Sequence, residues 1–133
     1  MSALDGLDKA LLCTRAALEK KAFDLVVIEV GELTSIADYL VICSGRSDRQ
    51  VQSIAQAIEE ALGAHGVRPL SIEGMSRGQW VLMDYGDVIV HVFYQPVREF
   101  YDLERLWEHA PRVQLSETLR TQALDFPGGA AGL

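Results

Sequence analysis

Two short and almost uninterrupted apolar runs limit the folds open to this chain more than any other feature. Residues 24–30 read DLVVIEV and residues 38–44 read DYLVICS, and both are rich in β-branched side chains. Nearly continuous apolar character is typical of central strands that are covered by protein on both faces. The connector between them, GELTSIA, is rich in turn-forming residues. The runs therefore favour an α/β protein with helices packed on a sheet.

Two segments have the periodicity of amphipathic helices. Over about residues 3–20, leucines spaced by three, four and seven positions form one apolar stripe. A second helix is expected over about residues 47–62, where apolar side chains recur three and four positions apart. Ser47 is its predicted N-cap, with Gln50 three positions later as in a capping box, and Gly63 supplies a stop.

Three more strands and a short helix complete the prediction. The strands are expected at 68–73, 79–84 and 88–94, and the last two flank the hairpin signal Tyr85-Gly86-Asp87. A helix is predicted over 97–109, with Leu103, Leu106 and Trp107 on the stripe that anchors it to the sheet. The element order is then α-β-β-α-β-β-β-α, which predicts a mixed five-stranded sheet with flanking helices.

The length of 133 residues predicts one domain. We place it at residues 1–112, followed by a partly disordered C-terminal tail at 113–133. Within the tail, residues 114–124 have the spacing of a short amphipathic helix, whereas residues 127–133, PGGAAGL, cannot build a core.

Charge narrows the classes of partner. Nineteen acidic against twelve basic residues give a net charge of −7, so binding to nucleic acid through a broad basic face is disfavoured. A basic protein surface is the more natural partner. Cys13 and Cys43 are too few for a disulfide framework and are interpreted as buried thiols in a reducing compartment. The N-terminus lacks the basic start of a signal peptide, and no apolar run approaches the roughly 18 residues that span a bilayer, so we expect a cytoplasmic protein.

Two loops have a possible chemical role and a plainer structural one. The turn SGRSDR at 44–49 enters a helix and resembles loops that hold phosphate, but it lacks the lysine of a Walker motif, so a capped strand-to-helix turn is favoured. Asp84 and Asp87 are three positions apart around a tight turn. They are suitable ligands for magnesium, but the favoured interpretation is that they accept hydrogen bonds from turn amides.

Two side chains on the predicted hairpin, those of His91 and Trp80, have either a structural role in the core or a functional role. His91 shares a strand face with Ile89 and Phe93, and a partly buried, hydrogen-bonded histidine is favoured over a ligand or a base. Trp80 alternates with Leu82 and Asp84, and its roles as a core residue or as an interface anchor are evenly balanced, because tryptophan is enriched at binding hot spots.

Three blocks of this sequence resemble the ribosomal silencing factor family, also called the Iojap family. They are IADYLVICSGRS at 36–47, IEG at 72–74 with GQWVLMDYGDVIVHVF at 78–93, and REFYDLERLW at 98–107. Their order and spacing match over roughly residues 5–110, and the tail after residue 113 lies outside the resemblance.

The resemblance implies a fold similar to nucleotidyltransferases without their catalytic acids, and therefore no enzymatic activity, no cofactor and no metal. It implies binding to the large ribosomal subunit through its fourteenth protein, which blocks joining of the small subunit under nutrient limitation, and a homodimer when the protein is free. By motif position, the partner-binding role is carried over to Trp80, Asp84, Tyr85, His91, Arg98 and Tyr101, with Glu73 as a further candidate.

Two functions from different classes follow. The first is a translational repressor that acts by steric occlusion. The alternative is a metal-dependent nucleotidyl or phosphoryl transferase that uses Asp84, Asp87 and the 44–49 turn. The strand after that turn, RPLSIE, offers only Glu73 where such enzymes need paired carboxylates, so the sequence favours the repressor.

Overall fold

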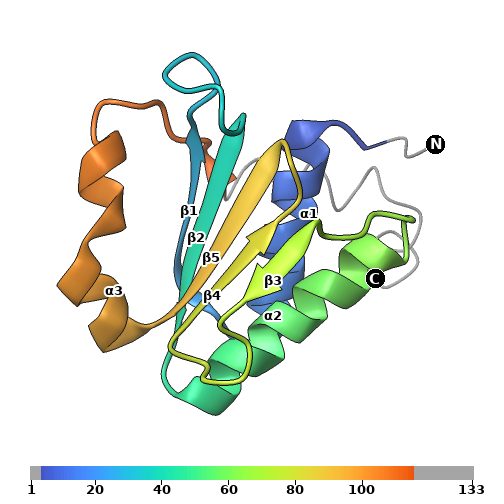
Figure 1. Cartoon of the computed structure of the whole chain (residues 1–133), viewed down its shortest axis with the longest axis vertical. Coiled ribbons are helices and arrows are strands. Elements are labelled where there is room, and N and C mark those ends of the chain that lie inside the picture. The colour runs from blue at the N-terminus through green and yellow to red at the C-terminus, as the bar shows by residue number, and fades with distance from the viewer. Residues whose placement is uncertain (1–3, 116–133) are drawn as a thin grey trace.

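A mixed sheet forms the middle layer of the computed structural model, which describes residues 4–115 (Figure 1). Its strand order is β1-β2-β5-β4-β3, with β2 and β5 parallel and the other neighbours antiparallel. The strands are β1 (Phe23–Glu29), β2 (Tyr39–Gly45), β3 (Ser71–Glu73), β4 (Trp80–Asp84) and β5 (Val88–Tyr94). The helices are α1 (Gly6–Glu19), α2 (Asp48–Gly63), α3 (Gln95–Tyr101) and the 3-10 helix η1 (Leu103–Trp107).

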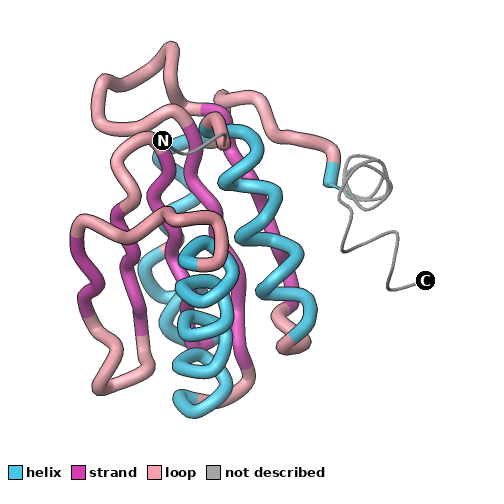
Figure 2. Tube along the Cα trace, turned by 90° about the vertical axis from the view of Figure 1, so that its right-hand side faces the viewer, coloured by secondary structure: helices cyan, strands magenta, loops and turns pink. Residues whose placement is uncertain are grey.

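The helices cover the sheet unequally. Figure 1 shows α1 and α2 on one face and α3 with the following segment on the other, and Figure 2 shows α1 and α2 lying side by side over the strands. The larger apolar cluster lies between the sheet and the α1–α2 pair, and a smaller one lies beneath α3 and η1. Among residues 4–115, no helix is long and apolar enough to cross a bilayer.

β5 shows how one strand serves both clusters. Val88, Val90 and Val92 belong to the cluster beneath α1 and α2, whereas Ile89 and Phe93 belong to the cluster beneath α3. Successive side chains of a strand point to opposite faces of the sheet. A strand that is apolar at nearly every position therefore contributes to the apolar clusters on both faces.

The sequence predictions of element type and order are confirmed, and so is the start of α2. The Ser47 hydroxyl accepts a hydrogen bond from the Gln50 amide at 3.0 Å. The Gln50 side-chain oxygen accepts from the backbone of Arg46 rather than from the cap residue itself, and its amide nitrogen donates to the carbonyls of Lys20 and Lys21. The predicted cap therefore also joins α2 to the end of α1.

The structure corrects the predicted position of the first strand. β1 is covered on both faces at Val27 and Ile28, as expected, but it lies at the edge of the sheet instead of the centre. Residues 111–113 lie along that edge, where the Val113 amide donates to the Val27 carbonyl at 2.9 Å. The predicted boundary between residues 112 and 113 falls inside this paired segment. The tail predictions for residues 116–133 lie outside the described residues.

The predicted helix over 97–109 is two elements. α3 ends at Tyr101, and the left-handed backbone of the next residue, Asp102 (φ 48°), interrupts the helix before η1 begins. This break changes which side chains face the sheet. Leu103 and Trp107 pack against the smaller cluster as predicted, but Leu106 is 74% exposed, so its predicted anchoring role is wrong.

The loop between β3 and β4 yields a test of the fold. Gly74 has φ +85°, and a Cβ there would collide with the carbonyl oxygen of Trp80. Gly66 has a similar φ of +77° with no atom within 4 Å. Strain alone costs about 1–2 kcal/mol for alanine in this region. We therefore expect Gly74→Ala to lower the free energy of unfolding in urea by about 3 kcal/mol or more, and Gly66→Ala by about 1 kcal/mol. Equal losses would contradict the close approach at residue 74.

Candidate functional site

Exposed apolar side chains gather where α3 meets η1. Phe100, Tyr101 and Leu106 are 81%, 56% and 74% exposed. With the partly buried Trp80 they line a surface depression of about 670 Å³. We call these four residues the α3 patch. An aromatic and aliphatic surface of this kind is typical of a protein-interaction site.

The local sequence explains why the patch faces outward. Pro96 lies in the first turn of α3, where its missing amide costs no helical hydrogen bond. At the other end, the Asp102 amide donates to the Arg98 carbonyl and the chain turns into η1. The turn brings Leu103 against the sheet and directs Leu106 to solvent.

Trp80 connects the patch to the sheet. Its indole Nε1–H donates to Nδ1 of His91 at 3.0 Å. Its ring lies 4.8 Å from the ring of Phe93 and 5.0 Å from that of Tyr101, measured between centroids. Trp80 is therefore both a core and a surface residue, fixed below by β5 and covered in part by the end of α3.

His91 is held in the neutral form. It is only 6% exposed, and burial lowers its pKa from 6.5 to about 4. A neutral imidazole has one nitrogen that accepts a hydrogen bond, and here that nitrogen is Nδ1, which faces the indole of Trp80. His91 is therefore a hydrogen-bonded core residue, as the sequence favoured.

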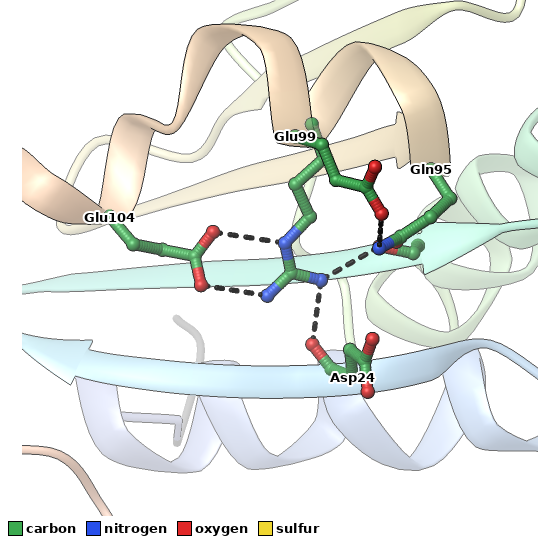
Figure 3. A network of polar contacts seen from close by, with 6 residues as sticks. Asp24, Gln95, Glu99 and Glu104 are labelled. Atoms are coloured by element: carbon green, nitrogen blue, oxygen red, sulfur yellow. Dashed lines mark hydrogen bonds and ion pairs between the residues drawn. The ribbon is translucent and has the colours of Figure 1, made fainter.

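Arg98 is the centre of a polar network beneath α3. Its Nε and Nη2 each donate to one carboxylate oxygen of Glu104 at 3.0 Å, and its Nη1 donates at 2.7 Å both to the Asp24 carbonyl and to the Ser44 hydroxyl. Figure 3 shows Asp24 and Glu104 approaching the network from different elements, with Gln95 and Glu99 beside it. The guanidinium therefore joins β1, β2, α3 and η1.

The partners of Arg98 are adapted to it. Asp24 has a left-handed backbone (φ 51°) within the irregular register between Phe23 and Val26, which directs its carbonyl to the guanidinium. The hydrogen bonds from Arg98 hold the pKa of Glu104 below its ordinary value. Glu104 is thus a carboxylate at neutral pH and forms a two-point ion pair with Arg98.

The structure brings five of the predicted partner-binding residues to one side of the molecule. The pairing Glu73 with Leu82, and Leu82 with His91, forms a row across the sheet on the α3 side. Trp80 and Asp84 lie on the same face of β4, and Tyr101 reaches it from α3. Glu73 is exposed, whereas Asp84 is partly buried and accepts a hydrogen bond from the Gly86 amide at 2.8 Å.

The other two predicted residues do not present their polar groups at this surface. Tyr85 is 5% exposed and packs in the cluster beneath α1 and α2, where burial raises the pKa of its phenol. Arg98 is 6% exposed, and its guanidinium faces inward. A role of Arg98 in partner binding would therefore be exerted through the surface residues above it, whereas Tyr85 lies on the opposite face of the sheet.

The groups considered for metal or phosphate chemistry have structural partners. Asp84 holds the turn amide described above, and Asp87 forms an ion pair with Lys9 at 3.0 Å. Among residues 4–115, no three or more histidine, cysteine or acidic side chains are grouped so as to hold a metal. The thiols of Cys13 and Cys43 are fully buried, as predicted, and burial raises the pKa of Cys43 to about 12.

Sequence reasoning missed three residues of the site. Phe100 lies within the block at 98–107, but nothing in the sequence indicated that its side chain is exposed. Leu106 was assigned inward by helical spacing, and the break at Asp102 reversed it. Glu104 lies six positions after Arg98, an interval that does not bring two side chains together on a continuous helix.

Comparisons of this chain with a family model and with individual proteins agree on one family. The family model described as "Ribosomal silencing factor during starvation" matches residues 4–127. The match extends well beyond residue 113, so the expectation that the tail lies outside the resemblance is wrong for residues up to 127. A Bacillus subtilis protein named "Ribosomal silencing factor RsfS" is 40% identical over 109 residues, covering 80% of this chain and 92% of that protein.

A solved structure and a more distant relative add to this. A crystal structure of a Chromobacterium violaceum protein superposes with a TM-score of 0.77 at 32% identity, covering 85% of this chain and 93% of the other. A mouse protein named "Mitochondrial assembly of ribosomal large subunit protein 1" is 30% identical over 92 residues, which are 67% of this chain and 40% of that protein.

The low pKa of His91 predicts how stability depends on pH. His91 binds a proton near pH 6.5 in the unfolded chain and only near pH 4 in the folded chain. The unfolded state therefore binds more protons between these values, so titration of His91 leaves the free energy of unfolding unchanged above pH 6.5 and lowers it as the pH drops toward 4. The expected loss is on the order of 3 kcal/mol, at about 1.4 kcal/mol for each tenfold change in proton affinity. It is measured by urea unfolding across this range.

Two variants isolate the contribution of this residue. His91→Gln retains an oxygen that accepts from Trp80 and should lose the part of the pH dependence that comes from His91. His109, whose side chain is 93% exposed, supplies the matched control, and His109→Gln should keep the wild-type profile. Identical profiles for wild type and His91→Gln would show that His91 does not titrate as described.

Proposed function

The chain belongs to the ribosomal silencing factor family, and we propose that it represses translation by binding the large ribosomal subunit and blocking its joining to the small subunit. The proposed contact is the fourteenth protein of the large subunit, and the proposed setting is nutrient limitation in the cytoplasm. The name of the mouse relative, which refers to the large ribosomal subunit, supports the choice of subunit.

The observation that carries this proposal is the α3 patch. Three large apolar side chains more than half exposed on two adjacent short helices leave apolar surface in water that a partner would cover. Trp80 gives the patch a rigid floor, because its ring is fixed by His91 and Phe93. A preorganised aromatic anchor loses little conformational freedom on binding, which favours affinity.

Charge supports a basic partner. The chain carries a net charge of −7. The patch is bordered by the exposed Glu99 and by Asp102, whose carboxylate forms an ion pair with the exposed Arg105 at 3.0 Å, so the support comes chiefly from the net charge of the whole chain. Ribosomal proteins are commonly basic because they bind RNA phosphates, so an acidic protein is attracted to them and repelled by bare RNA. Complementary charge of this kind accelerates encounter and selects the partner.

The predicted residues divide into three proposed roles. Trp80, Tyr101, Asp84 and Glu73 lie on the α3 side and are proposed to face the partner, together with Phe100 and Leu106, which the structure adds. His91 and Arg98 are proposed to support this surface from beneath. Tyr85 lies on the opposite face of the sheet, so its proposed contribution is limited to the stability of the hairpin.

The proposed mechanism is occlusion and needs no bond-making step, cofactor or metal. The transferase alternative is not favoured, because Asp84 and Asp87 are engaged by the turn amide and by Lys9. In the absence of the ribosome we propose a homodimer, because an exposed apolar surface of this kind favours association.

Co-sedimentation with separated ribosomal subunits tests the proposal. We expect the purified protein to pellet with large subunits and not with small subunits, and addition of the protein to large subunits should reduce the yield of joined ribosomes. Raised salt should weaken the binding, because attraction between exposed charges is screened over about 8–10 Å at physiological ionic strength. Pelleting with small subunits alone would overturn the proposal.

A matched pair of leucines tests the role of the patch. Leu106 and Leu70 are 74% and 76% exposed, but Leu70 lies before β3 and outside the patch. Neither change to serine should alter the free energy of unfolding by more than about 0.5 kcal/mol. We expect Leu106→Ser to weaken large-subunit binding by about 1–3 kcal/mol and Leu70→Ser to leave it unchanged. Equal effects of the two substitutions would place the contact surface elsewhere.

A further inference from the structure

We propose that Arg98 and Glu104 are positioning residues that set the placement of the α3 patch on the sheet. This inference rests on the function proposed for that patch and extends it to two residues of the network beneath it. Neither residue lines the patch: Arg98 is 6% exposed and its guanidinium points toward β1 and β2, and the carboxylate of Glu104 is paired with that guanidinium.

The hydrogen bonds of Arg98 connect four elements of the structure, namely α3, η1, β1 and β2. Two parallel hydrogen bonds of 3.0 Å fix the guanidinium plane relative to Glu104. The remaining nitrogen is fixed to the sheet by the Asp24 carbonyl and the Ser44 hydroxyl, both at 2.7 Å. The planar, forked guanidinium makes all four bonds at once, which the single ammonium of lysine cannot do.

The two partners bracket the patch along the chain. Phe100 and Tyr101 lie between Arg98 and Glu104 along the chain, and Leu106 follows Glu104 by two positions, so the ion pair closes the turn that carries two of the patch residues and leads directly to a third. On the other side, the Tyr101 ring lies against Trp80. The segment is thereby held to the sheet at two places, one polar at β1 and β2 and one aromatic at β4.

Apart from Arg98, the contacts that hold the segment are the ring contact of Tyr101 with Trp80 and apolar packing. α3 has seven residues and η1 five, and helices this short are not stable by themselves. Apolar contacts of Val97, Leu103 and Trp107 hold the segment to the smaller cluster, but such contacts have no directional preference. The hydrogen bonds of Arg98 supply the direction, and so determine where Phe100 and Leu106 are presented.

Stability alone does not account for this arrangement. A buried ion pair gains little net free energy, because the cost of desolvating two charges offsets their attraction. What the ion pair does provide is a fixed orientation of the guanidinium. The left-handed backbone of Asp24 places its carbonyl where it accepts from Arg98, so β1 also contributes to that orientation.

Two substitutions and one control test the inference. Arg98→Lys keeps the charge and loses the fork, and Glu104→Gln keeps the shape and loses the carboxylate. The control is Arg46→Lys, the same change at an exposed arginine whose guanidinium lies 4.4 Å over the ring of Phe23 and is not a partner of Glu104. Each protein is measured for binding to isolated large subunits, for hydrogen exchange of its backbone amides, and for urea unfolding.

We expect Arg98→Lys and Glu104→Gln to weaken subunit binding by about tenfold or more, and Arg46→Lys to leave it unchanged. Amides of residues 98–107 should exchange about tenfold faster in the two variants, while amides of α1 and α2 keep their wild-type rates. A merely structural role would not produce this contrast, because a general loss of stability accelerates the globally exchanging amides of α1 and α2 as well.

Each contrary result has a distinct meaning. Wild-type binding by both variants, or a uniform rise of exchange across all helices, overturns the positioning role. If the unmodified protein does not bind large subunits, the proposed function fails, and the exchange contrast still decides whether Arg98 fixes the segment. If Arg98→Lys does not fold, Glu104→Gln decides the question, because its side chain lies nearer the surface and is 21% exposed.

Discussion

The parallel pairing of β2 with β5 is the constraint on which the rest of the structure depends. These two strands occupy the middle of the sheet and are its most completely buried members. A parallel pair needs a long connection, and here the chain between them supplies α2 and the β3–β4 edge. Because both faces of the pair are apolar, both must be covered, which requires α1 with α2 on one side and α3 with η1 on the other.

The two covers are built by different means. Beneath α1 and α2 the contact is a broad apolar cluster, and long amphipathic helices suffice to hold it. The cover formed by α3 is small, and polar groups lie beneath it on the sheet, namely Ser44 and His91. Each finds a directional partner in Arg98 or Trp80. Hydrogen bonds therefore determine the placement of α3 to a degree that apolar packing does not.

This difference matters for recognition. A short segment held by directional bonds presents Phe100, Tyr101 and Leu106 outward, so the surface that we propose as the contact site is also the one least supported by apolar core. A rigid apolar surface within an acidic protein suits a folded basic partner, because hydrophobic contact supplies affinity and charge supplies selection. The proposed occlusion needs only a stable shape. The groups that were considered for chemistry agree with this, because Asp84 and Asp87 are engaged and both thiols are buried.

The sequence by itself determined the elements and the family. Periodicity located the strands and helices, and alternation placed His91 on one face with Phe93 and Trp80 on one face with Leu82. The N-cap at Ser47 could also be predicted. All of these signals act over only a few residues along the chain. Tertiary structure alone decided that β1 lies at an edge, that Asp102 breaks the last helix, and that Leu106 faces solvent. It also decided that Arg98 faces inward, because its partners Asp24, Ser44 and Glu104 come from three other elements and meet only in the folded chain. Local patterns carry information about local hydrogen bonds and burial, whereas a contact between distant segments depends on the packing of the whole molecule.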